Sequence, residues 1–305
     1  MLKSKDIEFS REVKEALENN RPILVLESTI ITHGMPFPEN YQTAKMLEDI
    51  CRKNQVTPAT IAIVKGKVQI GLDDDKLQEL SNLTSHVEKV SVRDIAYCLA
   101  SGKSGGTTVA ATSFLASLVG LEVFATGGIG GVHRGVAHTW DISADLQSLK
   151  DNHVIVVSAG AKAILDIPKT LEILDSYSVP VLAYKTNDFP AFYSSTSDNK
   201  VRQINSPAEI AKVWKKQEEL KLRSGLLIAN PIPQKFEIPA EIIERQIQVA
   251  LKELTELGIS GKGITPFLLQ RLYELTDGQS LVTNIELVKN NVLLACAIAR
   301  ELKSL

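Results

Sequence analysis

Short apolar runs that each end in small or polar residues recur along this sequence, and they constrain its fold more than any other feature. They are PILVLEST (22–29), TIAIVKGKVQIGL (60–72), EVFATGG (122–128), HVIVVSAG (153–160), VPVLAYKT (179–186) and GLLIANPIP (225–233). Such Val- and Ile-rich runs are typical of strands buried on both faces. Most of them follow a helical stretch, so we expect an α/β protein with three α/β/α layers and a largely parallel sheet.

Amphipathic patterns predict helices between and after these strands. One lies near residues 9–19, one spans 239–257 with Pro at its start and Gly258 just past its end, and two more fill 266–305 around the break TDGQS. We expect residues 1–305 to form one domain. The apolar stripe of the second helix comprises Ile242, Ile243, Ile247, Ala250, Leu251, Leu254 and Leu257.

Charge and composition exclude several classes of protein. Lys and Arg total 34 against 36 for Asp and Glu, so no global basic surface predicts binding to nucleic acid or an anionic membrane. The first twenty residues are charged and lack a signal-peptide core, and the longest apolar stretches fall short of a membrane helix. The three cysteines, Cys51, Cys98 and Cys296, are widely spaced, which suggests free thiols in a reducing compartment. We therefore expect a cytoplasmic protein.

Two nucleotide-binding motifs are nearly present and both fail. A phosphate loop ending in Gly102-Lys103-Ser104 requires glycine where the sequence has Tyr97. A dinucleotide fingerprint in GGIGGVHRG requires glycine where the sequence has His133. The sequence therefore gives little support to a nucleoside triphosphate or dinucleotide site.

Polar residues gather where the predicted strands end. In an open α/β sheet ligands bind at the carboxyl ends of the strands, so these positions predict the site. They are Glu27-Ser28-Thr29, Thr126-Gly127-Gly128, Ser158 to Lys162, Lys185-Thr186 and Asn230-Pro231.

Lys162 and Glu27 stand out at these ends. A partly desolvated lysine beside small residues has a lowered pKa and can form a Schiff base, although most such lysines only extend to solvent. A buried Glu27 should have a raised pKa and can move protons near neutral pH, unless it simply pairs with a cation. His33 and His133 are weaker candidates that can instead bridge backbone groups.

Two further segments can be interpreted either as ligand-binding sites or as simple helix caps. The turn at residues 105–108 precedes a helical pattern and can bind an anion, but capping by threonine is the favoured interpretation. Asp141, Ser143 and Asp145 alternate, so an extended chain points them to one side, as an Mg²⁺ or Mn²⁺ site requires. Capping of the helix that follows explains the same residues equally well.

Long blocks of the sequence resemble the pseudouridine-5'-phosphate glycosidase family, also called indigoidine synthase A-like. They include VLESTIITHGMPFPEN, KVSVRDIAYCLASGKSGGTTVAAT, FATGGIGGVHRGVAHTWDISADL, SAGAKAILD and LLIANPIP. The resemblance implies a homotrimer that reversibly cleaves the C-glycosidic bond of pseudouridine 5'-phosphate to uracil and ribose 5-phosphate, with Mn²⁺ as cofactor. Residues 193–205 look less typical and are expected to form a variable surface loop.

The resemblance also implies roles for particular residues. Lys162 matches the nucleophilic lysine, Glu27 the proton donor and Asp141 the metal-binding aspartate. Substrate-binding positions match Lys89, Val109, Ser143, Ala144 and Asp145. Thr126, His133 and Asn284 are additional substrate contacts that we expect.

This chemistry suits the reaction, because a carbon leaving group needs covalent activation. We hypothesise that Lys162 attacks the anomeric carbon as the ribose ring opens, that Glu27 moves the proton, and that collapse to an iminium expels uracil. The alternatives are a phosphosugar kinase, which needs a nucleotide site, and a non-catalytic binder of ribose 5-phosphate, which would not need Lys162.

Overall fold

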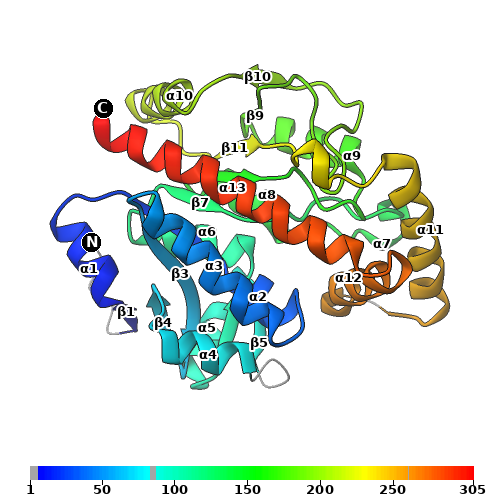
Figure 1. The fold of residues 1–305 in the computed structure, drawn as a ribbon, viewed down its shortest axis with the longest axis horizontal. Coiled ribbons are helices and arrows are strands. Elements are labelled where there is room, and N and C mark those ends of the chain that lie inside the picture. Colours follow the sequence, from blue (N-terminus) through cyan, green and yellow to red (C-terminus); the bar gives the residue numbers. More distant parts are fainter. Residues whose placement is uncertain (1–5, 83–86, 260) are drawn as a thin grey trace.

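The computed structural model describes residues 6–82, 87–259 and 261–305, so the first five residues of the charged N-terminal segment lie outside it. Eleven strands form one sheet, in which β3, β2, β7, β8, β11, β9 and β10 lie side by side and pair in parallel (Figure 1). Their bounds are β2 Ile23–Leu26, β3 Thr57–Val64, β7 Val123–Ala125, β8 Ile155–Ser158, β9 Val181–Tyr184, β10 Arg202–Ile204 and β11 Leu226–Ala229.

Helices cover both faces of this sheet. On one face α13 (Gln279–Ser304) crosses β2, β7 and β8, with α3 (Glu39–Lys53) and α10 (Pro207–Glu219) beside it. On the other face α6 (Val109–Leu118) packs on β2 and β3 and against α8 (Ala144–Asp151), which contacts α9 (Ile167–Ser176). The expected α/β/α arrangement with a largely parallel sheet is confirmed.

The run at residues 60–72 is not one strand, as we expected, but a hairpin. β3 and β4 (Lys67–Ile70) pair antiparallel, and Lys65 and Gly66 both have positive φ at the turn between them. A two-residue hairpin turn needs this backbone conformation. Short strands that the patterns did not predict extend this side: β1 Ile7–Phe9, β5 Glu88–Val90 and β6 Gly105–Thr107. Phe9 therefore ends a strand, and the predicted helix begins after it as α1 (Arg11–Glu18).

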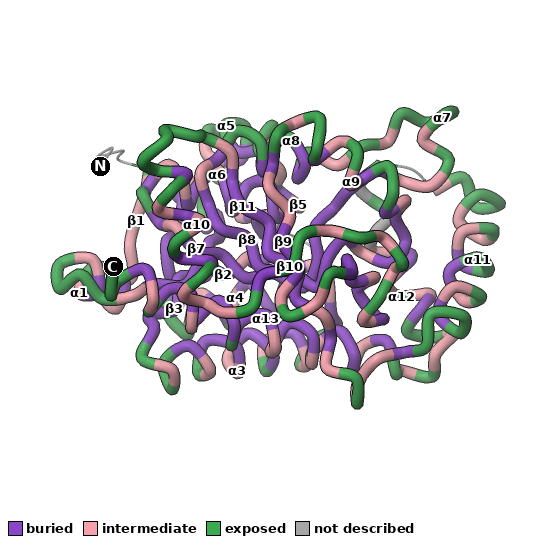
Figure 2. Tube along the Cα trace, turned by 90° about the horizontal axis from the view of Figure 1, so that it is seen from above, coloured by how far each residue is buried: buried purple, intermediate pink, exposed green. Residues whose placement is uncertain are grey.

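Three smaller helices accompany this side of the sheet, and others lie toward the opposite end of the molecule, where Figures 1 and 2 show α7, α11 and α12. The first group comprises α2 Thr29–His33, α4 Asp74–Asn82 and α5 Val92–Ala100. The second comprises α7 Val136–Thr139, η2 Gln234–Phe236, α11 Ala240–Glu256, η3 Gly261–Gly263 and α12 Ile264–Leu275. Of the predicted stripe on α11, Ile243, Ile247 and Ala250 are buried, but Ile242 and Leu257 are exposed. The stripe is thus narrower than the sequence pattern suggested.

The helix α13 is long and apolar enough to cross a membrane by length and composition alone. It lies instead along the sheet, and Val292, Ala295 and Ile298 are among its fully or nearly fully buried side chains. The apolar composition of α13 is therefore explained by its place in the core of this fold.

Candidate active site

Three residues that follow neighbouring parallel strands converge on one pocket. Glu27 follows β2, Thr126 follows β7, and Lys162 lies in the turn after β8; all three line a small inner pocket of about 50 Å³. Lys89 and Asn284 also line it, as the family resemblance implied for Lys89 and as we expected for Asn284. The strand-end rule thus correctly predicted where Glu27, Thr126 and Lys162 meet.

Two other strand ends do not contribute. Lys185 is exposed, and Asn230 is buried away from the inner pocket, where its side chain donates to Asn291 Oδ1 at 3.0 Å. Asn291 in turn donates to the backbone oxygen of Thr126 at 2.8 Å. Asn230 and Asn291 therefore fix the end of β7 from behind the pocket.

The Glu27 carboxyl is a partly buried acid that faces the pocket. Burial raises its pKa above the ordinary value, as we predicted, while the charge of Lys162 and a hydrogen bond from the Thr126 hydroxyl act in the opposite direction. Asp145 raises this pKa further and Lys89 lowers it. A raised pKa suits Glu27 to donate and accept a proton near neutral pH.

The backbone around Lys162 is held in a tight turn. Its amide donates to the Ile129 oxygen at 3.1 Å, and its carbonyl accepts from the Leu165 amide at 3.0 Å. Ala161 and Ala163 on either side are buried, so small side chains do flank the lysine as the sequence suggested.

Arg134 clamps the same turn from the outside, and sequence patterns gave no sign of this role. Its guanidinium donates to the Ala163 oxygen at 3.1 Å and makes two bonds, of 2.6 and 2.9 Å, to the Glu244 carboxylate on α11. Bidentate arginine–carboxylate pairs have a fixed orientation. Arg134 therefore links α11 to the residue that follows Lys162.

Asp145 joins two segments of backbone. Its carboxylate accepts from the Ala110 amide at 2.8 Å and from the Gly130 amide at 2.7 Å. The amide of Asp145 itself donates to Ser143 Oγ at 3.2 Å, so Ser143 caps α8 and the helix-start interpretation is correct for this residue. Because its carboxylate is engaged in this way, Asp145 does not form a pair of free carboxylates with Asp141.

The glycines before α7 allow close approach of the protein's own side chains. A Cβ on Gly130 would lie 2.2 Å from Ser143 Oγ, and a Cβ on Gly128 would lie 2.6 Å from the Phe192 ring. Any residue other than glycine at position 128 or 130 would therefore clash with these side chains. The glycine-rich stretch is thus packed against the walls of the site.

Asp141 lies beside His133, with 3.9 Å between Asp141 Oδ2 and His133 Nδ1. Burial lowers the pKa of His133, Asp141 opposes this shift, and the charges of Lys162 and Lys89 add to it. These electrostatic interactions connect Asp141 and His133 to the inner pocket, although neither residue lines it.

The segment at residues 105–108 is not the turn that we expected. Gly105–Thr107 form β6, and Thr108 caps α6 by accepting from the Ala111 amide at 3.4 Å, so the favoured interpretation, capping by threonine, is confirmed. Val109 is buried in the first turn of α6, and Ala144 begins α8. Because α6 and α8 pack together, the N-terminal residues Val109 and Ala144 belong to neighbouring helices.

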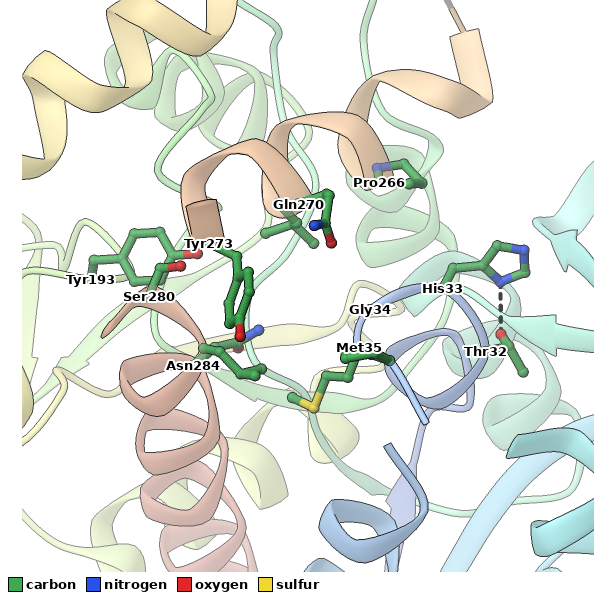
Figure 3. A pocket seen from close by; sticks show the side chains of 13 residues that line it. Thr32, His33, Gly34, Met35, Tyr193, Pro266, Gln270, Tyr273, Ser280 and Asn284 are labelled. Atoms are coloured by element: carbon green, nitrogen blue, oxygen red, sulfur yellow. Dashed lines mark hydrogen bonds between the residues drawn. The ribbon is translucent and has the colours of Figure 1, made fainter. Parts of the chain in front are cut away.

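An outer cavity of about 520 Å³, whose lining residues Figure 3 shows, shares part of its wall with the inner pocket. Tyr193 lines the outer cavity and Phe192 the inner pocket, and both side chains are buried. The prediction of a variable surface loop at 193–205 is therefore wrong for Tyr193 and for Ser194, which is also buried. His33 lines both spaces, and its Nδ1 lies 2.7 Å from Thr32 Oγ1.

Comparison with known proteins agrees with this geometry. The model of the family described as indigoidine synthase A like protein matches residues 12–301. The chain belongs to this family. The pseudouridine-5'-phosphate glycosidase of Caldanaerobacter subterraneus is 51% identical over 300 residues, covering 98% of this chain and 97% of that protein.

Two solved structures have the same fold. An indigoidine synthase A-like protein from Thermotoga maritima superposes with a TM-score of 0.89 at 36% identity, covering 97% of this chain and 96% of that one. A prealnumycin C-glycosynthase in complex with ribulose 5-phosphate gives 0.91 at 33% identity, covering 99% and 98%. The family likeness therefore extends over nearly the whole chain.

Proposed function

We propose that this protein is a pseudouridine-5'-phosphate glycosidase that acts in pseudouridine catabolism. The observation that carries the proposal is the meeting of Glu27 and Lys162, an acid with a raised pKa and an amine, in one pocket with Lys89. Full-length relatives that are about half identical and carry this name support the assignment of substrate.

Lys162 is the nucleophile in the reaction that we propose. Its amine forms a bond to C1' of the ribose while the bond from C1' to the ring oxygen breaks and that oxygen takes a proton. The nitrogen lone pair then forms an iminium, and the electrons of the bond between C1' and uracil C5 pass to C5, which is protonated. Water hydrolyses the iminium to ribose 5-phosphate and free Lys162.

Glu27 supplies and recovers the protons of these steps. Thr126 holds its carboxyl by a hydrogen bond, and burial favours the protonated form that the ring oxygen or C5 requires. Because Lys162 lines the same pocket, Glu27 can protonate the ring oxygen or C5 of the substrate molecule whose C1' is attacked by Lys162.

Several residues are candidate hydrogen-bond donors to the phosphate and the sugar of the substrate. Lys89 offers charge at the inner pocket, and the backbones of Val109 and Ala144 lie in the first turns of α6 and α8, where anions are favoured. Ser143, Asp145, Thr126, His133 and Asn284 complete the proposed substrate contacts.

A divalent metal fits the donors at Asp141, where a half-exposed carboxylate lies beside an imidazole. Among the described residues no three Asp, Glu, His or Cys side chains form a metal-binding group, and Mg²⁺-like ions often bind one carboxylate and keep several waters. Asp141 would hold Mn²⁺, directly or through water, and the ion would polarise and orient substrate oxygens.

Replacing Asp141 with Asn should weaken Mn²⁺ binding by at least about ten-fold, since even the residues that only orient metal ligands are worth about 10- to 100-fold. Calorimetry or electron paramagnetic resonance on the purified protein measures this directly. Asp151→Asn, at an exposed position on α8, is the control. Equal Mn²⁺ affinity in Asp141→Asn and the wild type would contradict the assignment.

Incubation with pseudouridine 5'-phosphate and Mn²⁺, with free uracil followed by chromatography, tests the function itself. Uracil release supports the proposal. Binding of ribose 5-phosphate without any release would favour a non-catalytic binder, and consumption of ATP with ribose 5-phosphate or pseudouridine would favour a kinase.

Arg134→Met should lower kcat by about 10- to 100-fold and change KM little, because a nucleophile displaced by about 1 Å reacts on the order of 10²-fold more slowly. Borohydride trapping of the lysine adduct should slow in parallel. Arg134→Lys should recover part of the rate, and Glu244→Gln should cost less because the backbone contact to Ala163 persists. An unchanged trapping rate in Arg134→Met would show that the clamp has no part in positioning Lys162.

The cytoplasm as the place of action is an expectation from the sequence, and assembly as a homotrimer is an expectation from the family resemblance. Light scattering on the purified chain tests the trimer.

A further inference from the structure

The inner pocket is too small for the whole substrate. Its volume of about 50 Å³ is well below the roughly 300–1,000 Å³ of cavities that enclose a whole ligand the size of a drug. The outer cavity of about 520 Å³ shares part of its wall with this pocket. A molecule that reaches Lys162 and Glu27 therefore extends into the outer cavity. The shared residues are His33, Gly34, Pro266, Leu269 and Asn284.

The two spaces differ in charge. The inner pocket holds Glu27, Lys89 and Lys162, whereas the described residues that line the outer cavity include no Lys, Arg, Asp or Glu. A phosphate without a cationic partner is costly to bury, so the outer cavity is unsuited to the phosphate end. Its apolar side chains, such as Met35 and Leu281, suit the faces of a neutral ring.

Asn284 marks the junction of the two spaces. It is 7% exposed, and its Oδ1 has no hydrogen-bond partner within the part of the chain that the structure describes. A buried acceptor without a partner costs free energy, which a bound N–H group would recover. Around it, Gln270 and Tyr273 of α12 point into the outer cavity, and Ser280 of α13 lies beside Tyr193 in its wall (Figure 3).

The outer cavity is also much larger than one pyrimidine ring requires. Cavities of about 300–1,000 Å³ enclose ligands the size of drugs. Resting on the proposed function, we infer that the outer cavity is an extended subsite for the base, which accepts neutral aglycones larger than uracil. Pseudouridine 5'-phosphates with an apolar group on N1 of the base are then substrates, because their N3–H and both carbonyl groups are retained.

Cleavage of pseudouridine 5'-phosphate and of its N1-methyl and N1-benzyl derivatives, followed as release of the free base, tests this inference. We expect kcat/KM for the N1-benzyl compound to stay within about ten-fold of the parent value, whereas one methylene in a fitted apolar pocket already changes kcat/KM by about 10- to 200-fold. A larger loss with the parent cleaved normally overturns the inference. Failure to cleave the parent would remove the proposed function on which it rests.

Narrowing the outer cavity provides the second arm. Leu281→Trp should lower kcat/KM for the N1-benzyl compound relative to the parent by at least about ten-fold. Leu293→Trp, on the same helix but outside the cavity lining, should leave this ratio unchanged. Gln270→Trp, at an exposed position of α12, repeats the test should Leu281→Trp fail to fold. A ratio that neither cavity variant alters would show that the benzyl group lies elsewhere, which overturns the inference.

Discussion

Lys162→Ala is expected to lower uracil release by at least about 10⁴-fold, the scale on which the loss of a covalent nucleophile is felt. Without the ε-amine no bond to C1' forms. No iminium can then form at C1' to drive cleavage of the bond between C1' and uracil C5. Uracil release from pseudouridine 5'-phosphate measures the loss. Borohydride added during turnover should label Lys162 in the wild type and leave Lys162→Ala unlabelled on peptide mapping.

Two matched variants separate chemistry from charge. Lys162→Arg keeps a cation beside Glu27 but cannot form the Schiff base, so it should be as inactive as the alanine variant. Lys89→Ala removes the other lysine of the same pocket, and we expect it to raise KM while borohydride trapping at Lys162 persists. Full activity in Lys162→Ala, or a trapped adduct on another lysine, would exclude the mechanism.

The strand ends could be predicted because periodicity and one rule about parallel sheets suffice for them. Glu27, Thr126 and Lys162 each follow a run that forms a strand, and strands with adjacent places in the sheet bring them together. A common strand direction predicts only that the three residues lie at the same edge of the sheet. The adjacent places of β2, β7 and β8, which bring them into one pocket, come from the structure.

Contacts between segments that lie far apart in the sequence could not be predicted from it. Arg134 and Glu244 are separated by 110 positions, and neither belongs to a pattern that predicts the pair. The strand β6 has three residues, of which Gly106 tolerates no side chain because a Cβ would lie 2.1 Å from Thr32 Oγ1. The sequence shows Gly105 and Gly106, but it gives no indication that Thr32 packs so closely against Gly106 that only glycine fits there.

Local chemistry also left real alternatives at Asp141 and Asp145. Both are acidic, and alternation alone suggested that they point the same way. The family resemblance implied the metal for Asp141 and the substrate for Asp145, but it gave no physical reason for the difference. The helix α8 begins between the two aspartates, and the Asp145 carboxylate accepts from the backbone amides of Ala110 and Gly130, contacts that could not be predicted from the sequence.

Glu27→Gln is expected to lower kcat by about 10²- to 10⁴-fold, the usual contribution of a positioned proton donor. The amide can still accept the hydrogen bond from Thr126, so the shape of the pocket is retained. The Schiff base chemistry of Lys162 then lacks its proton source. Uracil release under saturating substrate measures the loss, and activity near that of the wild type would exclude Glu27 as the proton donor.

The same variant should be more stable than the wild type at neutral and alkaline pH. Burial raises the pKa of Glu27 in the folded state above its ordinary value of about 4.5, so the folded protein holds this proton more tightly than the unfolded chain. The free energy of unfolding of the wild type therefore falls as the pH rises from about 4.5 to the folded-state pKa, and then levels off. The Glu27→Gln variant has an amide without a titrating proton at this position, so it escapes this loss.

Denaturant unfolding of both proteins from pH 4 to pH 9 should show a stability difference that grows with pH and reaches about 0.5–2 kcal/mol in favour of Glu27→Gln, as when other destabilised active-site groups are removed. Lys162, Lys89 and Asp145 interact with Glu27 in both directions, yet the net shift remains upward, so burial decides the sign. A difference that shrinks as the pH rises would mean that the charged carboxylate is stabilised in the folded protein, and that Glu27 is an ion-pair partner of Lys162 rather than a proton donor kept ready by burial.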